Sequence, residues 1–179
     1  MPTGRGRTIA FIDNSNIFGG QNAAGWRIDW EKLIAELEKS GDVWQVHFFA
    51  SEDDPPRSSQ VGFYRHLKQV LNWEVHLYEL GHKTVKCGRC GHIETVKAEK
   101  GVDVGVATKM LTLAVNRAFD TAILISGDRD FLETVRFVKN LGLRVEVVGW
   151  RGAVAQHLEA ESSAAVVYLD DWKHRIQKA

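Results

Sequence analysis

Cysteine and proline are scarce in this sequence of 179 residues, and long hydrophobic runs do not occur. There are two cysteines, Cys87 and Cys90, and three prolines. Two cysteines spaced C-x-x-C exclude a disulfide framework and leave a metal-binding turn or a redox pair as alternatives. No apolar stretch reaches the length that a membrane-spanning helix needs. The polar segment Met1 to Thr8 lacks the apolar stretch of a secretory signal, so we expect a cytoplasmic protein.

The sequence also lacks an excess of charge of either sign. Lys plus Arg and Asp plus Glu both number 23, so the formal net charge is zero. A general basic field that would hold nucleic acid non-specifically is therefore absent. A metal-dependent nuclease needs only an acidic pocket beside a local basic rim. Neutral charge thus limits the size of a nucleic-acid-binding patch but does not exclude one.

The hydrophobic pattern predicts one packed domain of the α/β class. A hydrophobic content of 44 % is sufficient for a core in a chain of this length. Short apolar runs alternate with amphipathic segments, which predicts a three-layer α/β/α sandwich with a mostly parallel central sheet. The predicted strands are 8–12, 43–50, 74–80, 121–125, 144–148 and 164–169, and the predicted helices are 29–39, 61–71, 103–118, 131–141 and 153–161.

The remaining segments set the domain boundaries. We expect residues 1–7 to be a flexible N-terminal tail, residues 8–172 to form the domain, and residues 173–179 to be a C-terminal tail. The Gly- and Asn-rich segment 13–25 is interpreted as a loop. Residues at about 81–99 have no helical period and are interpreted as a β-hairpin insertion that carries the two cysteines.

Four aspartates follow strands or begin helices in this pattern. Asp13 follows the first strand, Asp128 and Asp130 follow the strand 121–125, and Asp103 begins a helix. Ligands of parallel sheets bind at the carboxyl ends of the strands, where these carboxylates would meet if the first and fourth strands are neighbours. Clustered carboxylates need a cation, and oxygen ligands favour Mg²⁺ or Mn²⁺. Such an ion activates water for phosphodiester hydrolysis.

Each of these residues also has a simpler interpretation. Asp130 with Glu133 fits a capping box, and Asp103 would favour the positive end of its helix without any ligand. Asn16 and Ser126, which we expect near the phosphate or beside Asp13, are also ordinary turn residues. Only the set as a whole predicts a metal site.

Three segments together resemble the NYN domain family, the LabA-like branch of the PIN-like nuclease fold. They are Phe11-Ile12-Asp13-Asn14-Ser15-Asn16-Ile17-Phe18, Lys100-Gly101-Val102-Asp103-Val104 and Ser126-Gly127-Asp128-Arg129-Asp130-Phe131. The resemblance runs from about residue 8 to residue 170. It implies a parallel α/β/α sandwich, a metal-dependent ribonuclease, and metal-binding roles for the four aspartates, with Asn16 as the matching polar residue. The cysteine hairpin is not required by the family pattern.

The cysteines of the hairpin segment have three interpretations. A C-x-x-C turn aims two thiolates at one point, and His82, Cys87, Cys90 and His92 would together supply the four ligands of a structural zinc site. The alternatives are two hairpins from two chains that share one ion, or a turn with two free thiols.

The segment is also the most basic part of the chain. With Lys100 and Arg129 it would form a phosphate-binding rim, or simply a solvated hairpin. Trp26 either stacks on a base or packs on its own domain.

The sequence therefore predicts an endoribonuclease that uses Mg²⁺ or Mn²⁺, with RNA as its partner and without a membrane. The alternative is a non-catalytic RNA-binding or regulatory module, dimerised through the cysteine hairpin. The oligomeric state, monomer or homodimer, stays open. A dinucleotide-binding enzyme lacks its G-x-G-x-x-G turn here, and an aspartyl phosphatase would need a second acid where Ser15 stands.

Overall fold

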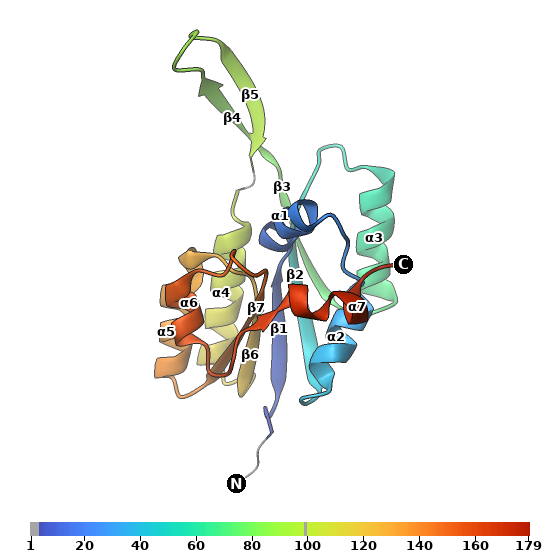
Figure 1. Ribbon diagram of the computed structural model, residues 1–179, viewed down its shortest axis with the longest axis vertical. Coiled ribbons are helices and arrows are strands. Elements are labelled where there is room, and N and C mark those ends of the chain that lie inside the picture. The colour runs from blue at the N-terminus through green and yellow to red at the C-terminus, as the bar shows by residue number, and fades with distance from the viewer. Residues whose placement is uncertain (1–3, 99) are drawn as a thin grey trace.

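The computed structural model describes residues 4–98 and 100–179 and forms a three-layer sandwich around one parallel sheet. The sheet has six strands in the order β3-β2-β1-β6-β7-β8 (Figure 1). All neighbouring pairs are parallel, which confirms the predicted fold class. The strands are β1 (Thr8–Asp13), β2 (Val43–Glu52), β3 (Glu74–Glu79), β6 (Thr121–Ile125), β7 (Arg144–Gly149) and β8 (Val167–Tyr168).

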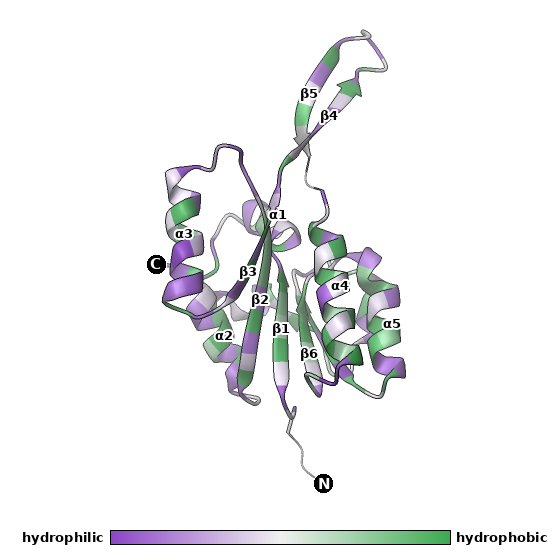
Figure 2. Cartoon of the chain, turned by 180° about the vertical axis from the view of Figure 1, so that it is seen from behind, coloured by the Kyte–Doolittle hydropathy of each residue, from purple (hydrophilic) through white to green (hydrophobic). Residues whose placement is uncertain are grey.

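Helices cover both faces of the sheet because the central strands are apolar on both sides (Figure 2). In β1, Ala10 and Ile12 face one core, while Ile9 and Phe11 face the other. One face carries α1 (Asn14–Ala24), α2 (Trp30–Glu38), α3 (Ser58–Gln69) and α7 (Lys173–Ile176), and the opposite face carries α4 (Val102–Val115), α5 (Leu132–Asn140) and α6 (Gln156–Glu161). In the part of the chain that is described, no helix is both long and apolar enough to cross a membrane.

The hairpin insertion forms a separate two-stranded sheet. Strand β4 (Gly81–Lys86) pairs antiparallel with β5 (Ile93–Ala98). The ribbon extends away from the sandwich, beyond the end of β3 and the beginning of α4 (Figure 1). Residue 99, the last of the expected insertion, lies outside the described residues.

The segment after β1 is a helix, so its interpretation as a loop was wrong. Asp13 caps α1 at its N-terminus, and Gly25, at φ 73°, ends it with a hydrogen bond from its N–H to the Gln21 carbonyl at 3.0 Å. Two adjacent glycines give this stretch a low helix propensity. The helix forms because it packs on the sheet, where Ile17 is fully buried.

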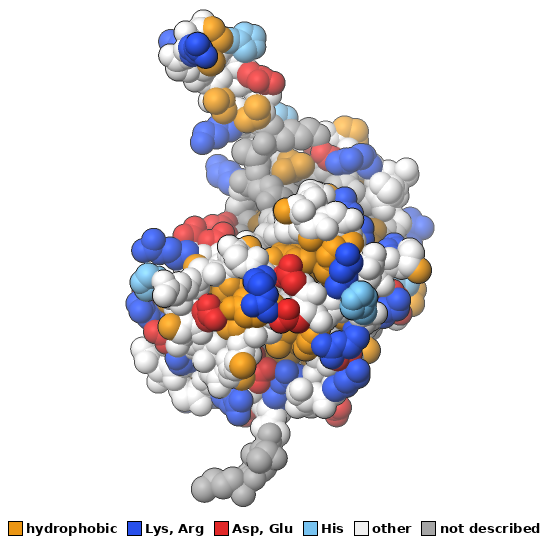
Figure 3. Space-filling view, viewed as in Figure 1, with side chains coloured by type: hydrophobic (Ala, Val, Ile, Leu, Met, Phe, Trp, Pro, Cys, Tyr) orange, Lys and Arg blue, Asp and Glu red, His pale blue; other side chains and the backbone are white. Residues whose placement is uncertain are grey.

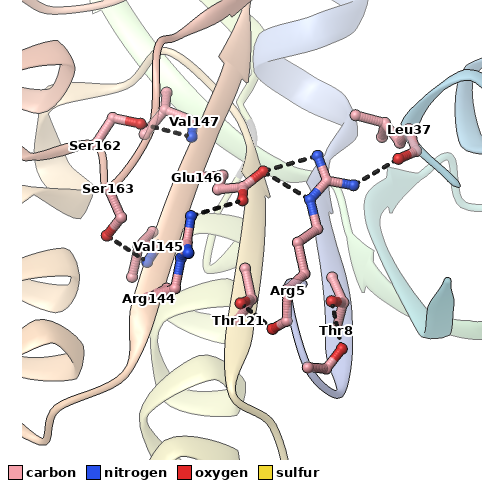
Figure 4. A network of polar contacts seen from close by, with 11 residues as sticks. Arg5, Thr8, Leu37, Thr121, Arg144, Val145, Glu146, Val147, Ser162 and Ser163 are labelled. Carbon is pink, nitrogen blue, oxygen red and sulfur yellow. Dashed lines mark hydrogen bonds and ion pairs between the residues drawn. The ribbon is translucent and has the colours of Figure 1, made fainter. Parts of the chain in front are cut away.

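The two expected tails both contact the domain where they are described. Arg5 lies against β7, where its guanidinium binds the Glu146 carboxylate at 2.8 Å (Figure 4). At the other end, the 3₁₀ turn η2 (Leu169–Trp172) and α7 complete the fold; another 3₁₀ turn, η1 (Arg129–Phe131), lies between β6 and α5. Ile176 of α7 is fully buried, and its carbonyl accepts from the Asp29 N–H at 2.8 Å. Residues 4–7 and 173–178 therefore pack on the domain. Residues 1–3 lie outside the described part.

Candidate metal-binding cleft

A cleft lies at the edge of the sheet where the neighbouring strands β1 and β6 end. Strand β1 lies between β2 and β6, and its Ile12 is in register with Ile125 of β6. The residues that follow these two strands therefore begin side by side, as expected for neighbouring first and fourth strands. The cleft has a volume of about 330 Å³ and is lined by Asp13, Ser15, Asn16, Lys100, Gly101, Val102, Asp103 and Asp128.

Asp13 is held at the base of this cleft by two hydrogen bonds. Asp13 is only 4 % exposed. One carboxylate oxygen accepts from the Asn16 backbone N–H at 3.3 Å, and the other accepts from the Ser126 hydroxyl at 3.0 Å. The first contact follows from its position as N-cap of α1, and the second from the β1–β6 register. The two hydrogen bonds fix the direction of this buried carboxylate.

The loop after β6 connects Asp13 to Asp128. The Asp128 backbone N–H donates to Ser126 Oγ at 3.2 Å, so the serine hydroxyl accepts from one aspartate and donates to the other. The Gly127 N–H donates to the Asn16 side-chain oxygen at 3.0 Å, which ties α1 to the same loop. A Cβ atom on Gly127 would lie 2.6 Å from the Ala153 carbonyl oxygen, so this close approach requires glycine.

The third wall of the cleft is the beginning of α4. Gly101 adopts φ 86° and starts the helix, which places Asp103 in its first turn with an exposed side chain. The helix can approach β3 here because Gly105 has no side chain; a Cβ atom there would collide with the Tyr78 hydroxyl. Lys100, also exposed, is the cationic side chain among the lining residues. The cleft thus combines three carboxylates and one ammonium group with the N-terminal ends of α1 and α4, which attract anions.

The side-chain donors of the cleft are of the kind that bind Mg²⁺ or Mn²⁺. They are carboxylate, amide and hydroxyl oxygens, without histidine or cysteine among the lining residues. Across residues 4–98 and 100–179, no three His, Cys, Asp or Glu side chains are grouped closely enough to enclose an ion. Mg²⁺ is commonly bound through one or two carboxylates, with water and substrate phosphate as its other ligands. The open cleft fits that mode better than a closed cage.

Three predicted site residues lie outside the cleft lining. Ser126 is fully buried and is connected to the cleft by its hydrogen bonds with Asp13 and Asp128. Asp130 and Arg129 are exposed in η1, at the rim. The capping-box interpretation of Asp130 was wrong, because Asp128 is the cap: its carboxylate accepts from the Asp130 N–H at 3.0 Å. A 3₁₀ turn therefore precedes α5, and Phe131 stands at the N-cap of that helix without a side-chain hydrogen bond.

The structure also places Trp26 and Ser15. Trp26 is buried and packs edge-on against Trp150 at a centroid distance of 5.0 Å, which confirms the alternative that it packs on its own domain. Ser15, which stands where an aspartyl phosphatase would need its second acid, lines the cleft. Its buried hydroxyl has no hydrogen-bond partner within the described residues. Its position two residues after a strand-ending aspartate was the only sequence signal.

A pair of histidines, the buried His47 and the half-buried His76, lies between the sheet and α4. His47 Nδ1 is 3.1 Å from His76 Nε2, and Phe11 and Phe49 stack against the two rings. Burial, with smaller effects of His76 and Lys109, lowers the pKa of His47 to about 3. Burial and then Lys109 also lower the pKa of His76. The pair is neutral at ordinary pH and belongs to the core.

The zinc site expected within one hairpin does not form in the structure. His82 is paired with Lys97 near the base of the hairpin, five residues before Cys87. Five strand residues span roughly 16 Å, and an odd separation puts the two side chains on opposite faces. His92 is opposite Cys87 across the turn, but the described residues hold no three-ligand group that includes it. Both cysteines are exposed and free. The N–H groups of Cys90 and Arg89 hold the pKa of the Cys87 thiol below its usual range.

Comparisons with known proteins agree with this fold. The family model described as "NYN domain" matches residues 7–170. A protein of Sinorhizobium fredii, described as the uncharacterized protein y4oD, is 38 % identical over 61 residues, which are 34 % of this chain and 28 % of that protein. The chain thus matches less than a third of that relative. A crystal structure of VPA0982, a protein of unknown function from Vibrio parahaemolyticus, has a TM-score of 0.70 at 22 % identity and covers 99 % of this chain and 100 % of that chain. This likeness concerns the fold alone.

Proposed function

Because this chain belongs to the NYN domain family, whose members are generally nucleases of the PIN-like type, we propose that it is an endoribonuclease that uses Mg²⁺ or Mn²⁺. One observation carries the proposal. Three aspartates from distant parts of the chain, Asp13, Asp103 and Asp128, line a single cleft at the carboxyl end of the central strands. A fold alone does not specify an activity, but a cleft of this chemistry at this edge supports phosphodiester hydrolysis.

In this proposal the three aspartates hold the ion, directly or through water. When bound, the metal lowers the pKa of a coordinated water and neutralises charge on the phosphate oxygens. The oxygen-only donor set of the cleft supports Mg²⁺ or Mn²⁺ over zinc.

The other polar groups of the cleft hold the carboxylates and attract the substrate. The Ser126 hydroxyl and the Asn16 N–H hold the Asp13 carboxylate in a fixed direction. Lys100 and the N-termini of α1 and α4 favour the approach of a phosphate group, which offsets the repulsion from the acids. Arg129 and Asp130, exposed beside the cleft, would contact the parts of the RNA that flank the cleaved bond.

The proposal is tested with a fluorogenic RNA and Mn²⁺. Asp13→Asn and Asp128→Asn each keep the size of the side chain but remove the charge. We expect each to lower the cleavage rate by at least about 100-fold, as loss of metal ligation does. The matched control is Asp42→Asn, because Asp42 is exposed just before β2, at the opposite end of the sheet. Equal rates for all four proteins would contradict the proposal.

A second candidate is an RNA-binding module without catalytic activity. It would use Lys100 and the N-terminal ends of α1 and α4, which attract phosphate without a metal ion. The same assay separates the two, with RNA affinity measured in parallel. RNA binding without cleavage in Mg²⁺ or Mn²⁺, unaffected by either aspartate substitution, would support the module and refute the nuclease.

A further inference from the structure

The cysteine hairpin has little internal support in the structure. Strands β4 and β5 pair with each other and stand clear of the sandwich (Figures 1 and 3). Nearly all their described side chains are exposed, including the apolar Val85 and Ile93, which are 44 % and 61 % exposed. An isolated two-stranded hairpin buries too little surface to be stable in water. A further interaction is needed to hold this hairpin in shape.

The tip of the hairpin has the geometry of a metal-binding knuckle. The Cys87 N–H donates to the His92 carbonyl at 2.8 Å, and the Gly91 N–H donates to the Cys87 carbonyl at 2.9 Å. Gly91 has φ 72°, which favours glycine directly after the second cysteine. Hydrogen bonds from the N–H groups of Cys90 and Arg89 lower the pKa of the Cys87 thiol. Both cysteines thus lie in one tight turn, and both are exposed and free.

One chain supplies only two ligands at this tip. His82 is too distant and lies on the other face of the hairpin. His92 does not complete a three-ligand group with the cysteines in the described residues. A structural zinc site takes four ligands, and thiolates are the ligands that select this ion. Two identical half-sites related by a twofold axis supply four.

We propose that two copies of the chain share one zinc ion between their hairpin tips, bound by Cys87 and Cys90 of each copy. Four thiolates around Zn²⁺ carry a net charge of −2, and Lys86 and Arg89 lie beside the cysteines in both copies to offset it. Contact between the tips would also cover part of the exposed Val85 and Ile93 side chains. The proposal does not depend on the proposed nuclease activity.

The test uses the full chain purified with zinc in a reducing buffer. We expect one zinc ion per two chains by elemental analysis, and a dimer by light scattering that becomes a monomer when a chelator removes the zinc. Replacement of zinc by Co²⁺ should give the visible absorption of a tetrahedral four-thiolate site. Cys87→Ser should lose both the metal and the dimer while the helical signal of its far-ultraviolet circular dichroism is kept.

His92→Ala and His82→Ala are the matched controls, and both should keep the metal and the dimer. Three results would overturn the proposal: one zinc ion per monomeric chain, loss of zinc in His92→Ala, or no zinc binding by the reduced protein. A dimer that survives both chelation and Cys87→Ser would also overturn it. Activity of the cleft variants Asp13→Asn and Asp128→Asn has no bearing on these outcomes.

Discussion

Two adjacent glycines in α1 permit a sharp test of how this helix packs. Gly19 and Gly20 both lie in the helix interior, where replacement of Gly by Ala stabilises by about 1 kcal/mol. Their surroundings differ. A Cβ atom on Gly19 would have nothing within 4 Å, whereas one on Gly20 would lie 2.0 Å from Cδ1 of the Trp150 indole. The same substitution should therefore have opposite effects at neighbouring positions.

The magnitude at Gly20 follows from what Trp150 would lose if it moved. Trp150 is 3 % exposed, and its Nε1–H donates to the Ile17 carbonyl at 3.0 Å. Displacement of the ring would cost about 1 kcal/mol for this hydrogen bond and about 1 kcal/mol for the edge contact with Trp26. Overpacking adds roughly 1–3 kcal/mol. After the helix-propensity gain, Gly20→Ala should destabilise by about 2–4 kcal/mol.

The two variants are compared by urea denaturation and thermal unfolding. Gly19→Ala should raise the free energy of unfolding by about 1 kcal/mol, so the two variants should differ by about 3–5 kcal/mol. For a chain of 179 residues this corresponds to roughly 6–20 °C in Tm. Equal stability of the two variants, within about 0.5 kcal/mol, would refute the argument that Gly20 is needed for the approach of Trp150.

Two further predictions concern charge. The unfolded chain takes up a proton at His47 near pH 6.5, whereas the folded chain does so only near pH 3, so stability should fall by about 2 kcal/mol from pH 7 to pH 5. In His47→Gln, the free energy of unfolding measured by urea denaturation should fall less between pH 7 and pH 5. A fall as large as that of the unsubstituted protein would contradict the role given to His47. Arg5→Met should cost about 3 kcal/mol, because it leaves the Glu146 carboxylate buried without its closer partner (Figure 4). Arg144, 49 % exposed and 3.6 Å from Glu146, provides the control, and Arg144→Met should lower the free energy of unfolding by less than about 1 kcal/mol. Equal losses in the two variants would contradict the argument that burial makes the Arg5–Glu146 pair the more important one.

The sequence alone determined the sheet and its family. The apolar runs that became β1 and β6 are recognisable because strands buried on both faces must be continuously hydrophobic. Parallel connections then require intervening helices, and the carboxyl ends of neighbouring strands must meet at one edge. This reasoning predicted the fold that the structure confirms, together with the cleft region around Asp13 and Asp128. The match of the NYN domain model to residues 7–170 confirms the predicted family.

Only the tertiary structure decided the contacts that depend on close approach. Helix α1 forms against its weak propensity because Trp150 and the sheet pack on it. The cap at η1 is Asp128 and not Asp130, because the Ser126–Gly127 loop must reach Asp13 and Asn16. Three-dimensional geometry likewise decides that Ser15 lines the cleft and that His82 lies far from Cys87. Local patterns reveal which face of an element is buried, but not which atoms of distant segments lie within a few ångströms of each other.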